Sequence, residues 1–159
     1  MTRHSIPTAE YRTFTDYDAA KQYVKSISHK VVIKASGLAA GKGVFLPETR
    51  DETIQALKEI MLDRKFGDAG GEVVIEEFLE GEELSILTFS DGKTFKSLPP
   101  AQDHKRIFDG DKGPNTGGMG CYAPTRIASA SVLDEIDKCI LDPTFEGLRQ
   151  EGKSIAGWN

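Results

Sequence analysis

A glycine-rich segment, Lys-Ala-Ser-Gly-Leu-Ala-Ala-Gly-Lys-Gly-Val at residues 34–44, lies between two short runs that favour extended backbone. Residues 30–36 are rich in β-branched side chains, and residues 44–47 resume the extended pattern. Backbone N–H groups exposed by glycine and a nearby ammonium group both favour phosphate oxygens. The segment therefore predicts a strand–loop–strand flap, with Lys34 on the first strand and Lys42 at the tip.

This flap differs from a Walker A loop. A Walker A loop has four residues between its glycines, then Lys with Ser or Thr, and then a helix. Here three residues separate Gly37 from Gly41, and a glycine follows Lys42 before the next extended run. The flap suits closure over a triphosphate, but a hairpin with a solvated lysine remains open, because the local spacing does not decide between the two.

Two amphipathic helices are predicted around the flap. Apolar side chains recur on one helical face after Asp18, and Thr49 with Glu52 forms a capping box ahead of a second such run. Residues 6–14 and 72–78 have the pattern of strands. Strands and helices mixed in this way predict an α/β (α+β) fold.

The second half of the chain predicts a hairpin, a long loop and a helix. The dipeptide at 91–92, Asp-Gly, is typical of a tight turn between two paired strands. Residues 99–124 change to glycine, proline and polar residues without periodicity, which indicates a ligand-binding loop. Ser131 is expected to cap the final helix, and Pro143 is expected to kink or break it.

Composition bounds the partners and the compartment. A net charge of -5 and a pI near 5.3 argue against nucleic acid or an anionic membrane as a partner. No apolar run has the length of a membrane span or the design of a signal peptide, and two cysteines are too few for a disulfide scaffold. We expect a reducing, cytoplasmic setting, with Cys121 and Cys139 buried or half-buried and without chemistry.

An acidic stretch at residues 75–83 follows the flap. Its carboxylates lie at the end of a predicted strand and after a glycine turn, where they can accept the hydroxyls of a ribose. Glu76 and Glu83 are seven residues apart across that turn, so they can share one cleft edge. Taken alone, such a stretch is more often a solvated turn, and this is the better interpretation of Glu80 and Glu82.

Residues 102–106 and 113–120 concentrate possible cations and glycines in an acidic chain. The planar fork of Arg106 matches phosphate, Asn115 can both donate and accept, and glycines allow close backbone approach. These segments predict a loop that wraps anionic oxygens. His104 is either an exposed or structural histidine or a member of this site, and its neighbours leave both interpretations open.

Taken together, residues 34–44, 76–83, 102–106 and 113–120 closely resemble glycinamide ribonucleotide synthetase, a family of ATP-grasp ligases. The resemblance runs from Met1 to about Glu151, and the last two segments are far more specific than the first two. It implies an ATP-grasp fold with the following parts: a mobile ATP lid at residues 1–79, part of the catalytic core at 80–151 with a substrate loop at 99–124, and an atypical tail at 152–159.

The resemblance also implies roles for single residues. The phosphate grip of ATP is expected at Lys34, Gly41, Lys42 and Gly43. The adenine and ribose are expected at Glu76, Glu77, Phe78, Leu79 and Glu83. The catalytic positions near the ATP phosphates are expected to be Arg106 and Asn115. The substrate side is expected at Asp103, His104, Lys105, Thr116, Gly118 and Met119.

The reaction implied by the resemblance joins glycine to 5-phosphoribosylamine in purine biosynthesis, with ATP and Mg²⁺. ATP first converts the glycine carboxylate into glycyl phosphate, which the amine attacks, and water must be excluded from the site. The metal ligands are expected outside this chain, with none within it. Family members also have a further domain before this segment, so the chain alone is expected to be an inactive fragment, and fusion to other purine-pathway domains is a further expectation.

Two alternatives accompany this interpretation. Another purine-pathway ATP-grasp ligase would share the fold, but it is not expected to carry both residues 102–106 and residues 113–120. A non-catalytic nucleotide-binding or interaction fragment agrees with the expected lack of metal ligands and disagrees with the intact substrate loop.

Overall fold

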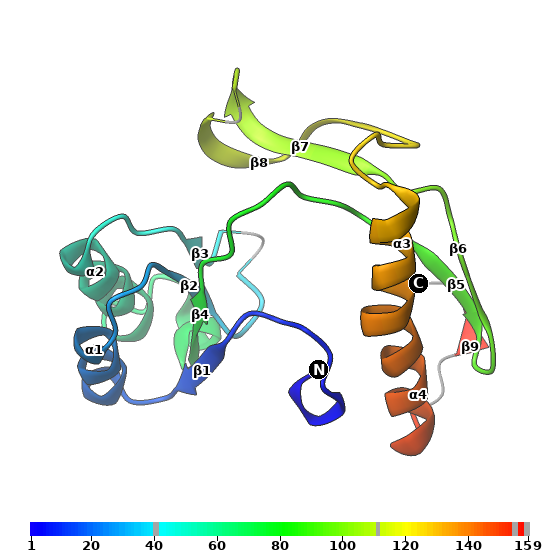
Figure 1. Cartoon of the computed structure of the whole chain (residues 1–159). Coiled ribbons are helices and arrows are strands. Elements are labelled where there is room, and N and C mark those ends of the chain that lie inside the picture. The colour runs from blue at the N-terminus through cyan, green and yellow to red at the C-terminus, as the bar shows by residue number, and fades with distance from the viewer. Residues whose placement is uncertain (40–41, 111, 154–155, 158–159) are drawn as a thin grey trace. The chain divides into compact units, whose positions relative to one another are not determined.

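The computed structural model describes residues 1–39, 42–110, 112–153 and 156–157. The chain forms two compact units, a first unit of Ala9–Glu80 and a second unit of Met1–Thr8 with Gly81–Asn159 (Figure 1). The boundary thus follows Glu80, and the first eight residues belong to the second unit. The roles of the two units as an ATP lid and a partial catalytic core stay predictions.

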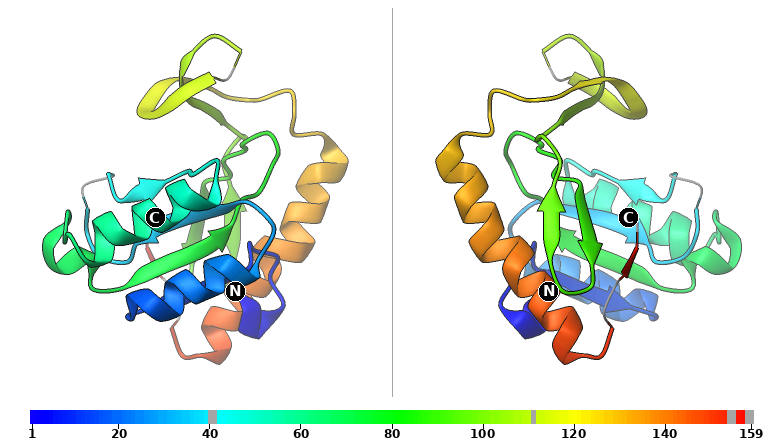
Figure 2. Two further views of the ribbon diagram at one scale, coloured as in Figure 1. Left: turned by 90° about the vertical axis from the view of Figure 1, so that its left-hand side faces the viewer. Right: turned by 90° about the vertical axis from the view of Figure 1, so that its right-hand side faces the viewer.

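The first unit is a four-stranded antiparallel sheet with two helices on one face (Figure 2). The strand order is β1–β4–β2–β3. The strands are β1 (Tyr11–Phe14), β2 (Val31–Ala35), β3 (Val44–Phe45) and β4 (Val73–Glu77). The helices are α1 (Tyr17–Ser26), α2 (Arg50–Met61) and a 3₁₀ turn at Gly67–Gly70. The strand expected over residues 6–14 begins only at Tyr11, since Pro7 has no N–H group to donate to a sheet.

Side-chain caps fix the start of both helices. Asp16 accepts a hydrogen bond from the Ala19 N–H at 2.8 Å and caps α1. Thr49 accepts from the Glu52 N–H at 3.2 Å, as the capping box predicts. The Glu52 carboxylate accepts from the Glu48 N–H at 2.8 Å, one residue before the cap, so the return bond is shifted by one position.

The core of the first unit lies between the sheet and its helices. Its fully buried large side chains are Ile33, Leu57, Ile60, Val73 and Ile75. Three of them come from β2 and β4, where alternate residues face the helices, and two come from the inner face of α2. The apolar residues of the predicted strands and of the predicted helix therefore pack together in one layer.

The second unit contains a three-stranded sheet, a long helical segment and a two-stranded hairpin. The sheet has the order β6–β5–β9, with β5 at Thr88–Asp91, β6 at Phe95–Ser97 and β9 at Ala156–Gly157. The helical segment consists of α3 (Ala130–Ile136), a π-helical turn (Asp137–Leu141) and α4 (Asp142–Gln150). The remaining elements are β7 (Gln102–Phe108), β8 (Lys112–Tyr122) and a 3₁₀ turn at Thr2–His4.

The hairpin predicted from Asp91 and Gly92 is confirmed. Gly92 has a φ of 86°, and the Asp91 carboxylate accepts from the N–H groups of Lys93 at 2.8 Å and Thr94 at 2.6 Å. These hydrogen bonds hold the pKa of Asp91 below its ordinary value. The turn connects β5 to β6, and Phe95 at the start of β6 stacks on Phe145 of α4 with ring centroids 4.8 Å apart.

The prediction of a long loop at residues 99–124 is wrong. Most of this segment forms the antiparallel hairpin of β7 and β8, with Gln102 opposite Tyr122 at its base. Two register shifts, between His104 and Arg106 and between Arg106 and Phe108, interrupt the regular pairing. These irregularities and the glycines of β8 conceal the period-2 pattern by which a strand is recognised.

Of the kink or break expected at Pro143, the break does not occur, and the predicted burial of the two cysteines is wrong. The helical segment continues through Pro143, which lies in the first turn of α4. The π-helical turn immediately before it shifts the hydrogen-bonding pattern, and proline is tolerated in a first turn. Cys121 and Cys139 are both exposed. Among the described residues, no helix is long and apolar enough to span a membrane.

The start of the chain is fastened to the end of α4 by an ionic cluster. The Glu151 carboxylate accepts from the Arg3 guanidinium and from the His4 ring Nε2, both at 2.8 Å. A Cβ at Gly147 would lie 2.7 Å from the His4 ring, so this glycine allows the ring to pack on the helix. The hydrogen bonds, that of His4 first, lower the pKa of Glu151 to about 2.

This cluster predicts a pH-dependent contribution to stability. The folded pKa of Glu151 lies below the ordinary value of 4.5, so the contribution is present above pH 4.5 and is lost as the pH falls through about 2. Replacement of Glu151 with glutamine is expected to lower the Tm at pH 6, and the Tm difference is expected to shrink toward zero near pH 2. Thermal unfolding from pH 2 to 6 measures it, with Glu135→Gln on α3 as the control. A difference that does not depend on pH would contradict the assignment.

Candidate functional site

Lys34 and Glu76, two residues of the predicted ATP site, form an ion pair in the first unit. Lys34 lies on β2 and Glu76 on the adjacent β4, where the residue directly opposite Glu76 is Val32. The two side chains are therefore diagonal neighbours on one face of the sheet, and both are only partly exposed. In this state the cation predicted to grip phosphate already has a carboxylate partner.

The flap next to Lys34 depends on close backbone approach. The Ala35 N–H donates to the Gly43 carbonyl at 2.8 Å, and the Lys42 N–H donates to the Ala39 carbonyl at 2.9 Å. A Cβ at Gly43 would lie 2.6 Å from the Cβ of Ala39, so only glycine fits without movement. Lys42 is exposed next to it, and the predicted site residue Gly41 lies outside the described residues.

The predicted adenine edge at the end of β4 is already partly hydrogen-bonded. The Glu77 N–H donates to the Glu10 carbonyl at 2.8 Å, and the Glu77 carboxylate accepts from the Glu10 N–H at 3.2 Å. The Phe78 N–H donates to the Lys30 carbonyl at 3.2 Å, and Leu79 is exposed. An adenine at this edge would therefore have to use other backbone groups than these two N–H groups.

In the second unit, three predicted site residues form one charged cluster. The Lys105 ammonium donates to the carboxylate of Glu83 and lies 3.6 Å from that of Asp103. The hydrogen bond to Glu83 is the main cause of a raised pKa at Lys105, so the ammonium stays charged. The sequence assigned Glu83 to ribose and the other two residues to the substrate side, and the structure brings all three together.

The opposite strand supports this cluster. The Thr116 hydroxyl donates to the Lys105 carbonyl at 3.0 Å and accepts from the Gly118 N–H at 3.1 Å. Gly118 has a φ of 131°, and a Cβ there would lie 3.2 Å from the Asp103 carboxylate. Two residues predicted for substrate binding thus hold the strand that carries the cluster. Met119 is exposed and has no contact of this kind among those described.

Arg106, one of the two predicted catalytic residues, is half-buried in the hairpin. Its guanidinium donates to the Gly113 carbonyl at 2.7 Å, across from β7 to β8. Asn115, the other predicted catalytic residue, lies directly opposite Arg106 in the register of the two strands. The pairing places both residues at the same level of the hairpin.

The base of the hairpin carries a group that the sequence did not single out. The Tyr122 hydroxyl donates to the Gln102 side chain at 2.8 Å, and the Thr125 hydroxyl lies 3.2 Å from that of Tyr122. The Tyr122 ring stacks on His104, with centroids 5.8 Å apart. His104 is thus an exposed histidine held by an aromatic neighbour. Had residues 102–122 been predicted as two paired strands, Gln102 and Tyr122 would have been expected opposite each other. The prediction of a loop did not indicate this contact.

Comparison with known proteins identifies the family to which the chain belongs. A family model described as phosphoribosylglycinamide synthetase, ATP-grasp (A) domain, matches residues 1–158. The chain belongs to this family. The match agrees with the resemblance stated from the sequence, and the other purine-pathway ligase left open above is not the family of this chain.

The relatives place this ATP-grasp domain within longer proteins. A bifunctional purine biosynthetic protein of Schizosaccharomyces pombe is 61% identical over 99% of the chain, which spans 20% of that protein. A phosphoribosylamine–glycine ligase of Streptococcus pyogenes is 50% identical over 99% of the chain, which spans 37% of it. The crystal structure of a phosphoribosylamine–glycine ligase from Thermotoga maritima has a TM-score of 0.87 at 36% identity and covers 99% of the chain, which spans 40% of it.

More distant structures confirm the fold alone. A D-alanyl-alanine synthetase A from Vibrio cholerae covers 93% of the chain, which spans 45% of it, with a TM-score of 0.67 at 15% identity. The predicted α+β ATP-grasp fold is therefore confirmed for this synthetase domain, together with its mixture of helices and antiparallel sheets.

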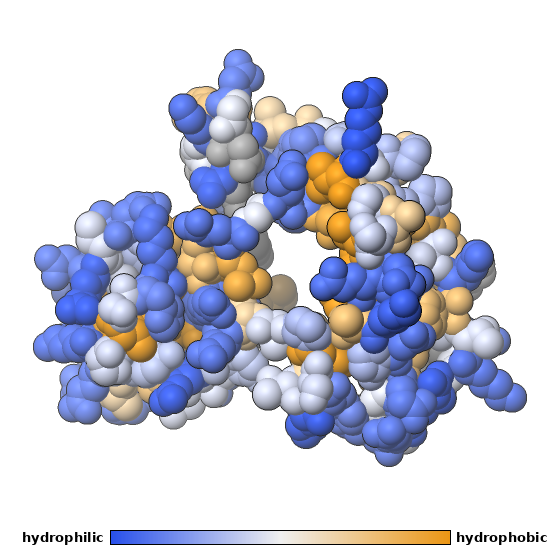
Figure 3. Space-filling model, in the orientation of Figure 1, coloured by the Kyte–Doolittle hydropathy of each residue, from blue (hydrophilic) through white to orange (hydrophobic). Residues whose placement is uncertain are grey.

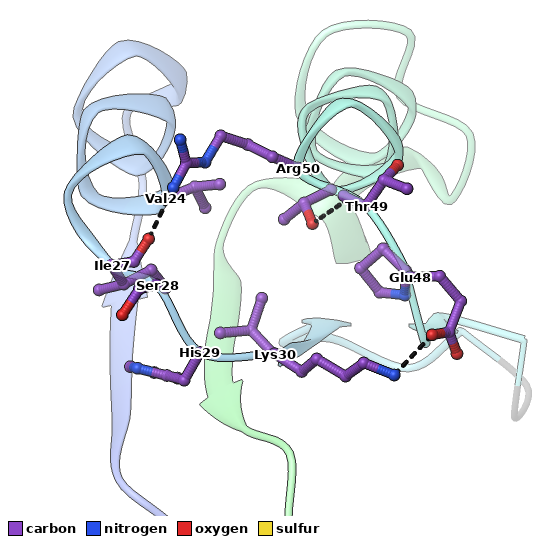
Figure 4. A pocket seen from close by; sticks show the side chains of 11 residues that line it. Val24, Ile27, Ser28, His29, Lys30, Glu48, Thr49 and Arg50 are labelled. Carbon is purple, nitrogen blue, oxygen red and sulfur yellow. Dashed lines mark hydrogen bonds and ion pairs between the residues drawn. The ribbon is translucent and has the colours of Figure 1, made fainter.

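A pocket of about 170 Å³ lies in the first unit, at residues to which the sequence gave no binding role (Figure 4). It is lined by the end of α1, the segment before β2 and the start of α2. Lys30 and Glu48 form an ion pair at 2.6 Å beside it, and the Arg50 guanidinium donates to the Ile27 carbonyl at 2.9 Å. The charged side chains of Lys30, Glu48 and Arg50 beside the pocket thus already have partners within the first unit.

The described residues of this ATP-grasp domain include no group of three or more His, Cys, Asp or Glu that could hold a metal ion. Large apolar side chains reach the surface of the second unit (Figure 3), and those on its strands and hairpin are Phe89, Ile107, Phe108, Met119 and Tyr122. Neither feature adds to the ion pair in the first unit or to the charged cluster in the second.

Proposed function

We propose that this chain is the ATP-grasp part of a ligase that joins glycine to 5-phosphoribosylamine and consumes ATP. The observation that carries the proposal is the match of the synthetase family over residues 1–158. The chain spans only 37% of the Streptococcus pyogenes ligase and 20% of the Schizosaccharomyces pombe bifunctional protein, so the activity belongs to the longer protein. By analogy with the latter, fusion to a second purine-pathway enzyme is part of this proposal. A cytoplasmic location, expected from the sequence, is a further part of it.

The chemistry determines which side chains such a domain needs. The γ-phosphoryl group of ATP passes to the glycine carboxylate and leaves ADP, then the amine attacks the carbonyl carbon and phosphate departs. The first step concentrates negative charge, which cations and backbone N–H groups stabilise. Lys34, Lys42 and the half-buried Arg106 are the cations that we assign to the phosphates, and we place Asn115 beside Arg106.

The remaining assignments follow the two units. The backbone of residues 76–79 is assigned to adenine and Glu83 to ribose. The hairpin residues Asp103, His104 and Lys105, with Thr116, Gly118 and Met119, are assigned to the side of glycine and 5-phosphoribosylamine. Magnesium would accompany ATP in such a reaction, and we place its ligands outside this chain.

A chimeric ligase tests this proposal. Residues 1–158 would replace the corresponding segment of the Streptococcus pyogenes ligase, to which the chain is 50% identical. The chimera is expected to release ADP only when both glycine and 5-phosphoribosylamine are present. Arg106→Met in the chimera serves as the matched inactive control. A folded chimera that binds Mg-ATP but releases no ADP would contradict the proposal and support a non-catalytic nucleotide-binding domain.

A further inference from the structure

We propose that Lys105 is a positioning residue, which holds the carboxylate of Glu83 in place for the ribose hydroxyls of ATP. This inference rests on the proposed function and goes beyond it, because the sequence placed Lys105 on the substrate side. The geometry that points to it is the hydrogen bond from the Lys105 ammonium to Glu83, which lies outside the hairpin, before β5. The Glu83 side chain is 51% exposed, so without this hydrogen bond it would sample several rotamers.

Lys105 is itself held from two directions, which a positioning group requires. Its ammonium lies 3.6 Å from the carboxylate of Asp103, two residues earlier on β7. Its carbonyl accepts a hydrogen bond from the Thr116 hydroxyl on β8 at 3.0 Å. The orientation of Glu83 is thereby linked to both strands of the hairpin.

The charge balance argues against a direct phosphate contact. Lys105 carries one positive charge between two carboxylates, so the cluster has a formal charge of -1. A phosphate that approached the ammonium would also meet Glu83 and Asp103. A carboxylate that accepts from ribose hydroxyls needs orientation and a counter-charge, and Lys105 supplies both.

The position of Gly118 supports the same arrangement. A side chain there would lie 3.2 Å from the Asp103 carboxylate and would need a backbone φ of 131°, which side chains rarely adopt. The glycine thus leaves room for Asp103, which in turn attracts the Lys105 ammonium away from solvent. The hairpin is shaped to keep this cation beside Glu83.

Two nucleotides separate a positioning role from a phosphate contact. The purified chain would be titrated by calorimetry with Mg-ATP and with Mg-2′,3′-dideoxy-ATP, which lacks the ribose hydroxyls. Lys105→Met is expected to weaken ATP binding about 2- to 10-fold, because the Glu83 side chain is then no longer held in one conformation. Binding of dideoxy-ATP is expected to stay unchanged. Lys105→Arg is expected to restore ATP binding, and Lys96→Met on β6 is the matched control.

The possible outcomes are distinct. In the variant Glu83→Gln the further change Lys105→Met is expected to have no added effect on ATP binding. Equal weakening for both nucleotides, or no weakening for either, would overturn the positioning role while nucleotide binding stands. A folded chain that binds neither nucleotide would overturn this inference, whereas the proposed function is tested separately by ADP release from the chimera. Exposed ion pairs contribute little to stability, so a large fall in Tm for Lys105→Met would indicate a structural role instead.

Discussion

The affinity of the chain for Mg-ATP is expected to fall about 10- to 100-fold when Lys34 is replaced with methionine, since a hydrogen bond to a charged group contributes about 1.5–3 kcal/mol. The substitution removes a cation assigned to the phosphates. It also leaves Glu76, the present partner of Lys34 on β4, as an uncompensated negative charge near the triphosphate. Both effects weaken binding, and calorimetric titration measures their sum.

Two variants make this measurement specific. Lys34→Arg keeps the charge and is expected to retain most of the affinity, while Lys96→Met removes an exposed lysine from β6 in the second unit and is expected to have no effect. The assignment of Lys34 fails if Lys34→Met binds Mg-ATP as tightly as the unmodified chain. Circular dichroism of each variant shows whether the sheet is intact.

Replacement of Leu57 with alanine is expected to lower the free energy of unfolding of the first unit by about 2–5 kcal/mol. Leu57 on α2 is fully buried against the sheet. Its truncation loses transfer free energy and leaves a cavity that the neighbouring side chains only partly fill. Urea unfolding followed by circular dichroism gives the change in midpoint.

The same chemical change at an exposed position is the control. Leu62 follows α2 directly and is 54% exposed, so Leu62→Ala is expected to change the free energy of unfolding by less than about 0.5 kcal/mol. Similar effects at the two positions would mean that α2 does not pack on the sheet through Leu57. The comparison tests the packing of the first unit independently of any ligand.

Much of the first unit could be predicted from the sequence because its signals are local. The apolar periodicity of α1 and α2, the cap at Thr49 and the β-branched run at 31–35 each depend on residues close together in the chain. Such patterns coincide with the burial that the structure shows, since the same residues form the core. The strand expected at 6–14 was too long at its start, and the extended run expected at 44–47 gives a strand of only Val44 and Phe45.

The hairpin at residues 102–122 could not be predicted in the same way. Its pairing joins residues up to twenty positions apart, and the two register shifts remove the alternation that a strand normally shows. Glycines that suggest a loop, such as Gly113 and Gly118, have positive φ values within β8. The local composition favours a loop, but the hydrogen bonds between the two strands make the segment a hairpin.

The contacts within the candidate site could not be predicted from the sequence either. The motifs indicated which residues carry charge, and the structure adds that Glu83 meets Lys105, twenty-two positions away. The helix through Pro143 shows the same limit, because the π-helical turn that accommodates it has no sequence signal of its own. Residue types could be predicted here, but partners could not.

The edge position of β3 has a consequence for how firmly this strand is held in the sheet. This strand has two residues and pairs only with β2, so it can peel from the sheet without disturbing the contacts of β4 and β1. Phe45 on β3 contacts Phe66 edge to face, with centroids 6.1 Å apart, and is the anchor that such peeling would release. Separation of β3 from β2 would also lose the packing of Phe45 on the core of the first unit and its contact with the Lys65 ammonium, 5.4 Å from the ring centroid, so it would cost more than a two-residue ladder.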